Sequence, residues 1–326
     1  MNDKRNQRLA ASQAHESESM ASETYEKYRS LMFSIAYRML GSVGEAEDIV
    51  QEAYLRLYSA TAQGVMVESP KAFLTTVTTH LAIDTVRSAR VKRETYIGPW
   101  LPEPLVTAPG ADPLERAELK DSLSLAFLVV LQRLSPVERA VFLLREVFDY
   151  GYDEIAGIVQ KSEDNCRQIF ARARKRIDDG KPRFNADQRE QQELADRFFD
   201  AVGKGDLGRL ISFLAEDVTF VGDGGGKATS YPMPIVGRER VEHILRGLFK
   251  VALRLGVTFR PVTINGQPGV LSFDADGGLI NVMALDIVDG AVRTVQSIVN
   301  PDKLARLGYP LSTAYHIAPP ATPRDA

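Results

Sequence analysis

The sequence predicts a multidomain protein in which two all-α domains, the second with a helix-turn-helix, precede one α+β domain. Apolar residues recur every three or four positions from about residue 23 to residue 179, which indicates amphipathic helices. Strand-like segments then alternate with the hairpin turns Asp276-Gly277-Gly278 and Asp289-Gly290. The length of 326 residues suggests about two domains, or three small ones.

Composition excludes several classes of protein. The chain is 44% hydrophobic and 25% charged, which is ordinary for a globular protein. Its longest apolar runs, such as Ala126–Leu131, are far shorter than the ~20 residues that span a bilayer, and no signal-peptide pattern begins it, so we expect a cytoplasmic protein. One cysteine, Cys166, and four scattered histidines predict no disulfide and no metal site. A net charge of −3 excludes a uniformly basic nucleic-acid binder but allows a local basic patch.

The first predicted domain covers residues 23–94, after a polar arm over residues 1–22 that we expect to be disordered. Three helices are predicted in it: one from Glu23 to a break at Gly41-Ser42, one from about Glu45, and, after a loop over Ala60–Pro70, one over Lys71–Arg93. The polar face of the second helix is mostly acidic, and the third helix ends in a basic cluster. A basic helix end suits DNA phosphates whatever their sequence.

A linker is predicted over residues 95–113, because its prolines and glycines forbid a helix. The linker nevertheless contains the large apolar residues Trp100, Leu101 and Leu105, which a plain spacer would not need. We therefore expect it to dock on another part of the chain, with Trp100 buried by that contact.

Residues 114–180 are predicted to form the second helical domain. Ser135 and Pro136 are typical of an N-cap followed by the first helical position. A short helix over Tyr152–Gln160, a turn, and a last helix capped by Ser162 complete a helix-turn-helix.

The last helix of this domain divides into an apolar and a basic face. The apolar face is predicted to be buried and consists of Cys166, Ile169, Phe170, Ala173 and Ile177. The other face is predicted to contact DNA through Asn165, Arg167, Gln168, Arg172 and Lys175. Arginine commonly reads guanine in the major groove, and asparagine or glutamine reads adenine. A solvated basic face with no DNA partner is the alternative interpretation.

The third predicted domain covers residues 185–317, followed by a tail over 318–326 that we expect to be disordered. Helices are predicted over Gln188–Val202, Leu207–Leu214 and Gly237–Leu255. Strands are predicted over Val218–Val221, Val257–Val262, Val270–Phe273, Leu279–Val288 and Ala291–Ile298. Helices packed on such an antiparallel sheet make an α+β domain.

Two helical signatures in this order resemble bacterial sigma factors. The segment Glu45–Leu57 resembles the polymerase-binding helix of region 2, Lys71–Arg87 resembles its promoter-melting helix, and Ser135–Ile177 resembles the helix-turn-helix of region 4. No region 3 lies between them, which is typical of the extracytoplasmic-function class. The resemblance implies that core RNA polymerase binds Glu47, Asp48, Gln51 and Glu52. It also implies promoter DNA contacts near the minus-ten element from His80, Arg87 and Arg90.

Three further motifs resemble the subgroup of this class that carries a fused SnoaL-like domain, the SigJ type. They are Trp100-Leu101-Pro102-Glu103-Pro104, Asp223-Gly224-Gly225-Gly226-Lys227 and Asn300-Pro301-Asp302-Lys303-Leu304. The resemblance implies a SnoaL-like cone that regulates the sigma factor in cis, with no separate anti-sigma protein, no membrane partner and no cofactor. It does not identify a small-molecule ligand.

An enzyme is the alternative function, namely a SnoaL-like cyclase or isomerase fused to a DNA-binding module. The titratable residues of the third domain that could serve it are Asp217, Asp223, His243 and Asp286. Nothing in the sequence arranges them as an acid–base pair, so we predict no catalytic residue and favour the sigma factor.

Overall fold

The computed structural model describes residues 22–107, 124–178 and 188–313. These residues belong to two compact units, and each unit is considered by itself. The first contains residues 22–91 and 131–178, and the second contains residues 92–107, 124–130 and 188–313. The tail 318–326 and all but the last residue of the arm 1–22 lie outside the described residues.

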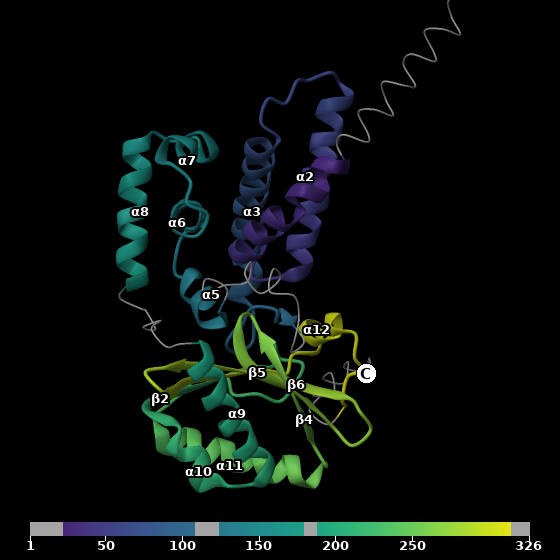
Figure 1. Ribbon diagram of the computed structural model, residues 1–326, viewed down its shortest axis with the longest axis vertical. Coiled ribbons are helices and arrows are strands. Elements are labelled where there is room, and N and C mark those ends of the chain that lie inside the picture. Colours follow the sequence, from purple (N-terminus) through teal and green to yellow (C-terminus); the bar gives the residue numbers. More distant parts are fainter. Residues whose placement is uncertain (1–21, 108–123, 179–187, 314–326) are drawn as a thin grey trace, which may run out of the picture. The chain divides into compact units, whose positions relative to one another are not determined.

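The amino-terminal part of the first unit consists of a helix over residues 22–40, α2 (Val43–Ala62) and α3 (Pro70–Glu94) (Figure 1). The side chain of Ser42 caps α2 by accepting a hydrogen bond from the Glu45 amide at 3.3 Å. As the helical spacing predicted, the apolar stripe of α2 is buried, and Val50, Ala53 and Leu57 pack with residues of both other helices.

The carboxy-terminal part of the first unit is a helix-turn-helix, as predicted. It contains α6 (Pro136–Glu146), α7 (Tyr152–Val159) and α8 (Glu163–Asp178). Ser135 and Glu138 form a capping box at the start of α6. Gln160 ends α7 in the left-handed conformation, with φ of 54°, and this allows the tight turn before α8.

These two helical parts pack on each other within the first unit. The Tyr150 and Thr75 hydroxyl groups form a buried hydrogen bond of 2.9 Å. The buried Arg139 guanidinium donates to the carbonyl groups of Met39 and Leu131. The Arg38 guanidinium lies over the Phe148 ring. Buried polar contacts of this kind stabilise this packing arrangement.

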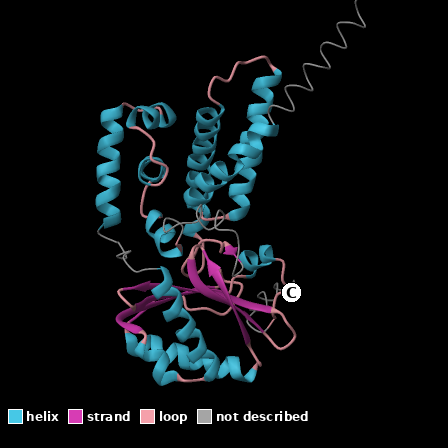
Figure 2. Ribbon diagram, in the orientation of Figure 1, coloured by secondary structure: helices cyan, strands magenta, loops and turns pink. Residues whose placement is uncertain are grey.

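The described residues of the second unit include a seven-stranded sheet with the strand order β1-β4-β5-β6-β7-β2-β3 (Figure 2). Its strands are β1 (Val106–Thr107), β2 (Leu214–Asp223), β3 (Ile235–Val236), β4 (Thr258–Ile264), β5 (Gln267–Phe273), β6 (Leu279–Val288) and β7 (Ala291–Ile298). Neighbouring strands are antiparallel except for β2 and β7, which are parallel.

Different elements pack against the two faces of this sheet. One face packs against α9 (Gln188–Lys204), α10 (Leu207–Ser212) and α11 (Arg238–Arg254) through a large apolar cluster. The other face packs against Leu101, Leu125 and the short helix α12 (Pro301–Leu304). Because side chains alternate along a strand, each central strand contributes to both clusters.

Two short strands were not predicted from the sequence. β3 is one of them, and the other is β1, in which linker residues pair antiparallel with β4 at the edge of the sheet. β2 also extends beyond the predicted Val218–Val221 at both ends, whereas β6 and β7 have the predicted bounds.

The boundary of the second helical domain differs from the prediction of 114–180. Residues 108–123 lie outside the described residues, and α5 (Leu125–Leu131) begins in the second unit, where Leu125 belongs to the sheet cluster.

Candidate linker-docking and nucleic-acid-binding sites

The three motifs of the resemblance meet at the end of β2, around the fully buried carboxylate of Asp223. Its Oδ2 accepts hydrogen bonds from the Leu101 amide at 2.8 Å and from Lys303 Nζ at 2.6 Å. Its Oδ1 accepts from the Tyr96 hydroxyl at 2.5 Å. We call Tyr96, Leu101, Asp223, Asn300 and Lys303 the linker clasp.

Lys303 is the cation of the linker clasp, and its side chain is only 7% exposed. Its ammonium also donates to the Leu101 carbonyl and lies 4.3 Å from the centre of the Trp100 ring. The Leu101 peptide is thus held at its N–H by Asp223 and at its C=O by Lys303. A buried ion pair satisfied in this way depends on both partners, because removing either one leaves an uncompensated charge.

Asn300 connects the linker clasp to α12. Its side-chain oxygen caps that helix at the Asp302 amide, and its Nδ2 donates to the Tyr96 hydroxyl at 2.8 Å. Burial, followed by the negative charge of Asp223, raises the pKa of Tyr96 well above its ordinary value. Tyr96 therefore remains a hydrogen-bond donor to Asp223 at physiological pH.

The glycines after Asp223 allow the linker to approach closely. Gly225 and Gly226 have φ values of 58° and 73°, in the left-handed region that favours glycine. A Cβ atom at Gly225 would lie 2.3 Å from Asn300 Nδ2, and one at Gly226 would lie 2.8 Å from Ile97 Cδ1. A side chain at either position would push the linker away from the turn.

A second contact holds the linker at β1. The Leu105 amide donates to Asn265 Oδ1 at 2.9 Å, and the Asn265 amide donates to the Leu105 carbonyl at 2.8 Å. Asn265 and Gly266 both have positive φ and form the turn between β4 and β5. Further along, the Leu125 amide donates to Gln267 Oε1 at 3.0 Å.

The remaining motif residues lie around the linker clasp. Leu101 is 1% exposed, whereas Trp100, which we expected to be buried, is only half-buried. The linker proline residues Pro102 and Pro104 are buried, and Glu103 is 4.0 Å from Arg306. Gly224, Pro301 and Leu304 have structural roles within the second unit. A Cβ atom at Gly224 would clash with the Ala228 carbonyl, and Pro301 is the first residue of α12. Leu304 packs in the apolar cluster that contains Leu101 and Leu125. The exposed Lys227 and Asp302 form an ion pair of 2.6 Å.

The candidate DNA-binding face of α8 is exposed. Its residues Asn165, Arg167, Gln168, Arg172 and Lys175 are all exposed, while Cys166, Ile169, Ala173 and Ile177 are buried as predicted and Phe170 is only half-buried. The Arg167 guanidinium contacts Glu163 at 2.9 Å and Asp164 at 3.2 Å. Those ion pairs are weak because they are exposed to solvent. The face can therefore offer its cations to DNA.

The candidate minus-ten residues lie on α3 in three different settings. His80 Nε2 is 2.5 Å from the Ile158 carbonyl of α7, so this packing occupies its side chain. Arg87 is exposed and pairs with Asp84 at 3.2 Å. The side chain of Arg90 lies outside the described part of the chain.

The candidate polymerase-binding residues lie on the polar side of α2. Asp48 and Gln51 are exposed, and Glu47 and Glu52 are partly exposed. Glu52 pairs with Arg56 at 2.8 Å, and the neighbouring Leu55 is 53% exposed. An acidic surface beside an exposed leucine suits a basic partner with an apolar groove.

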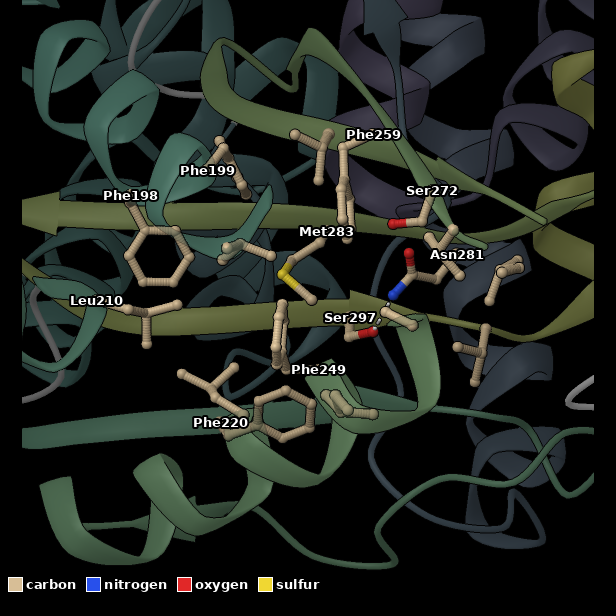
Figure 3. A pocket seen from close by; sticks show the side chains of 18 of the residues that line it. Phe198, Phe199, Leu210, Phe220, Phe249, Phe259, Ser272, Asn281, Met283 and Ser297 are labelled. Carbon is tan, nitrogen blue, oxygen red and sulfur yellow. Dashed lines mark hydrogen bonds between the residues drawn. The ribbon is translucent and has the colours of Figure 1, made fainter. Parts of the chain in front are cut away.

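An apolar pocket lies between the sheet and α9–α11 (Figure 3). No Asp, Glu, His, Lys or Arg is among the described residues that line it. Asp217 instead pairs with Arg293 at the surface, His243 is exposed, and Asp223 belongs to the linker clasp. Asp286 of β6 is not among the lining residues, and its Oδ1 accepts a hydrogen bond from Gln267 Nε2 at 3.2 Å. Tyr231 is thus the one side chain in this described lining that could take part in acid–base chemistry, and no carboxylate or histidine is there to pair with it.

Sequence reasoning missed three residues that fix the linker and the start of α5 to the sheet, namely Tyr96 and Asn265 for the linker and Gln267 for Leu125. The dipeptide Asn265-Gly266 is a strong hairpin signal and could have located the β4–β5 turn. No local pattern indicates that the same asparagine binds the linker, because Leu105 lies 160 residues away in the sequence.

Comparison with family models gives three matches. Sigma-70 region 2 matches residues 24–91, Sigma-70 region 4 matches residues 124–177, and the SnoaL-like domain matches residues 195–298. None of the helices in the described ranges is long and apolar enough to cross a membrane.

Similar proteins and structures are consistent with this domain order. The ECF RNA polymerase sigma factor SigJ of Mycobacterium tuberculosis is 37% identical, over 88% of this chain and 93% of that protein. A probable ECF RNA polymerase sigma factor of the same species, SigI, is 32% identical, over 87% of this chain and 94% of that protein. The crystal structure of the M. tuberculosis SigJ protein matches with a TM-score of 0.71 and 33% identity, covering 89% of this chain and 100% of that one.

Proposed function

The chain belongs to the extracytoplasmic-function family of RNA polymerase sigma factors, and we propose that its SnoaL-like domain regulates it in cis by holding the linker between regions 2 and 4. As a sigma factor it binds core RNA polymerase and promoter DNA. The exposed basic face of α8 supports minus-35 recognition, and the acidic face of α2 supports polymerase binding.

The observation that carries the cis-regulation is the buried Asp223–Lys303 pair closed around the Leu101 peptide. α3 ends at Glu94 and the linker clasp begins at Tyr96, so the chain passes directly from the last region 2 helix into this contact. The linker is then fixed as far as β1, where it pairs with β4. Docking therefore restricts the geometries that regions 2 and 4 can adopt on a promoter, and undocking shifts that population.

Regulation within the chain removes the need for a separate anti-sigma protein. The linker clasp supplies what such a partner would supply, namely a folded domain bound to the segment between the two promoter-reading regions. The alternative function, a cyclase or isomerase, has little support from the pocket, because its described lining contains no carboxylate, histidine, lysine or arginine.

Run-off transcription with purified core polymerase tests the proposal. The full-length chain should direct specific initiation, and Lys303→Met, which opens the linker clasp, should change the amount of transcript or the promoters used. Lys227→Met is the matched control, because Lys227 forms an exposed ion pair beside the same site. No specific transcript from the wild-type chain would reject the sigma-factor function. Equal transcription from wild type and Lys303→Met would reject the cis-regulation alone.

A further inference from the structure

Two buried polar side chains are neighbours on the face of the sheet that packs against α12. They are Asp286 of β6 and Gln296 of β7, which are 3% and 2% exposed. Across these strands Asp286 pairs with Thr294, and Ala284 pairs with Gln296. Ala284 belongs to the apolar cluster of this face together with Leu125, and residues two apart on a strand share a face. Asp286 and Gln296 are therefore diagonal neighbours, and the long glutamine side chain can reach the carboxyl group.

Both side chains present oxygen acceptors to each other. Gln296 Oε1 is buried and has no hydrogen-bond partner among the described residues. Asp286 Oδ1 accepts a hydrogen bond from Gln267 Nε2 at 3.2 Å. An ionised Asp286 cannot donate to Gln296, so the buried amide oxygen stays unsatisfied, which is unfavourable. A proton on Asp286 removes the buried charge and supplies a donor for Gln296.

Gln267 connects this pair to the start of region 4. Its Nε2 donates to Asp286, while its Oε1 accepts the Leu125 amide at 3.0 Å. Leu125 is fully buried, is the first residue of α5, and lies within the residues that match Sigma-70 region 4. One amide side chain thus links the buried carboxyl group to the first helix of region 4. We call Asp286, Gln296 and Gln267 the acid–amide cluster.

We propose that the acid–amide cluster makes the packing of α5 on the sheet depend on pH. When Asp286 is protonated, it donates to Gln296 Oε1, and the start of α5 stays on the sheet through Gln267. When Asp286 is ionised, the start of α5 separates from the sheet and water reaches the carboxylate. The proton is exchanged with solvent in this step. The effect on transcription rests on the proposed function, whereas the movement of α5 rests on these buried contacts alone.

The surroundings of Asp286 favour its protonated form. β5 and α5 contain no charged residue. The charge of Arg293 on β7 opposes protonation, but its guanidinium pairs with the exposed Asp217. The ammonium of Lys303 on α12 pairs with Asp223. Burial outweighs the charge of Arg293 and raises the pKa of Asp286 to about 6.

The direction of the pH effect follows from this pKa. An aspartate in water has a pKa of about 4, so Asp286 binds its proton more tightly when α5 covers it than when water reaches it. Protonation therefore favours the closed arrangement of α5. A rise in pH through about 6 favours the open one.

Hydrogen–deuterium exchange of the full-length chain tests this movement. Protection of the α5 amides, corrected for the intrinsic exchange rate at each pH, should fall roughly tenfold between pH 5 and pH 7.5. Asp286→Asn places a neutral donor beside Gln296, so α5 should stay protected at both pH values. Asp289→Asn is the matched control, because Asp289 is exposed in the turn after the same strand and its φ of 52° also suits asparagine. It should keep the wild-type pH dependence.

Two further variants test the amides of the cluster. Gln296→Leu leaves the protonated Asp286 without an acceptor, so α5 should lose protection at a lower pH than in the wild type. Gln267→Leu removes the link to Leu125, so α5 should lose protection at both pH values. Exchange of α9, which packs on the opposite face of the sheet, shows whether each variant remains folded. The proposal is overturned if wild-type α5 protection does not change with pH, if Asp286→Asn keeps the change, or if Gln296→Leu does not shift it.

Run-off transcription at pH 7.5 tests the consequence for promoter use. Asp286→Asn keeps α5 closed at this pH, so its amount of transcript should differ from that of Asp289→Asn. Equal transcription from these two variants, with the expected exchange of α5, would overturn the regulatory role and confirm only the movement. The proposed function fails separately, through the transcription of Lys303→Met at constant pH.

Discussion

The ion pairs of α8 and the ion pair of the linker clasp use similar charged groups in opposite environments. Arg167 contacts Glu163 and Asp164, whose side chains are 47% and 90% exposed, whereas Asp223 and Lys303 are 0% and 7% exposed. Water screens the first set, so its members can separate at little cost when DNA arrives. The buried pair separates only if the linker leaves the buried surface that encloses the pair. Ion pairs between the same kinds of group thus separate easily on the exposed face of α8 but hold the linker firmly in the linker clasp.

The largest effect is expected from breaking the buried pair. Lys303→Met leaves the Asp223 charge buried and should lower the free energy of unfolding of the second unit by about 3–5 kcal/mol. Urea unfolding followed by Trp100 emission measures it, since that ring lies against Lys303.

The exposed Lys227 provides the control for this change. Lys227→Met removes an ion pair with Asp302 in which both side chains are more than half exposed, and it should cost less than about 1 kcal/mol. Equal losses in the two variants would mean that burial does not distinguish the two pairs.

Asp286 extends the comparison to a buried carboxylate without a hydrogen-bonded cation. Burial raises its pKa to about 6, although the charge of Arg293 opposes this shift. The folded chain therefore holds this proton more tightly than the unfolded chain does. Its contribution to stability is full below about pH 4 and is lost as pH rises through about 6. Asp286→Asn should remove that dependence and stabilise the second unit by roughly 3 kcal/mol at pH 8, as measured by urea unfolding between pH 4 and pH 8. An unchanged pH profile in the variant would show that another group is responsible.

On the exposed face of α8, substitutions should distinguish residues that recognise bases from residues that bind phosphate. Arg172→Ala should weaken recognition of the preferred minus-35 sequence by about 1–3 kcal/mol and relax its base preference. Lys175→Ala should weaken binding more evenly across sequences. Selection of minus-35 sequences from a random library by the reconstituted holoenzyme measures both. Identical sequence profiles for Arg172→Ala and the wild type would exclude Arg172 as a base reader.

The same contrast explains how much could be predicted from the sequence. The faces of α8 follow from helical periodicity alone, and the structure confirms the predicted buried residues Cys166, Ala173 and Ile177. The linker was predicted to dock because of its large apolar residues, and Leu101 is buried, but Trp100 is only half-buried and β1 was not predicted. Tyr96 and Asn300 lie 204 residues apart, and no local pattern specifies such a contact. Only the resemblance of the three motifs indicated that they act together.

The smallest change in stability, with a clear change in DNA binding, is expected from Glu163→Gln combined with Asp164→Asn. Both carboxylates lie in the first turn of α8, where they favour the helix dipole, so their loss should cost at most about 1 kcal/mol of stability. The double variant releases Arg167 from both carboxylates, although its guanidinium still lies over the Tyr152 ring, and it removes two charges that repel phosphate. Binding of the holoenzyme to the selected promoter should therefore strengthen several-fold at low salt. Fluorescence anisotropy of labelled promoter DNA measures this. Asp200→Asn with Glu242→Gln is the control, because it also neutralises two helical carboxylates that pair with a cation on the same helix, here on α9 and α11, which are in the other unit. Equal strengthening by the control would mean that net charge attracts the DNA, and that the ion pairs of Arg167 do not limit what α8 can read.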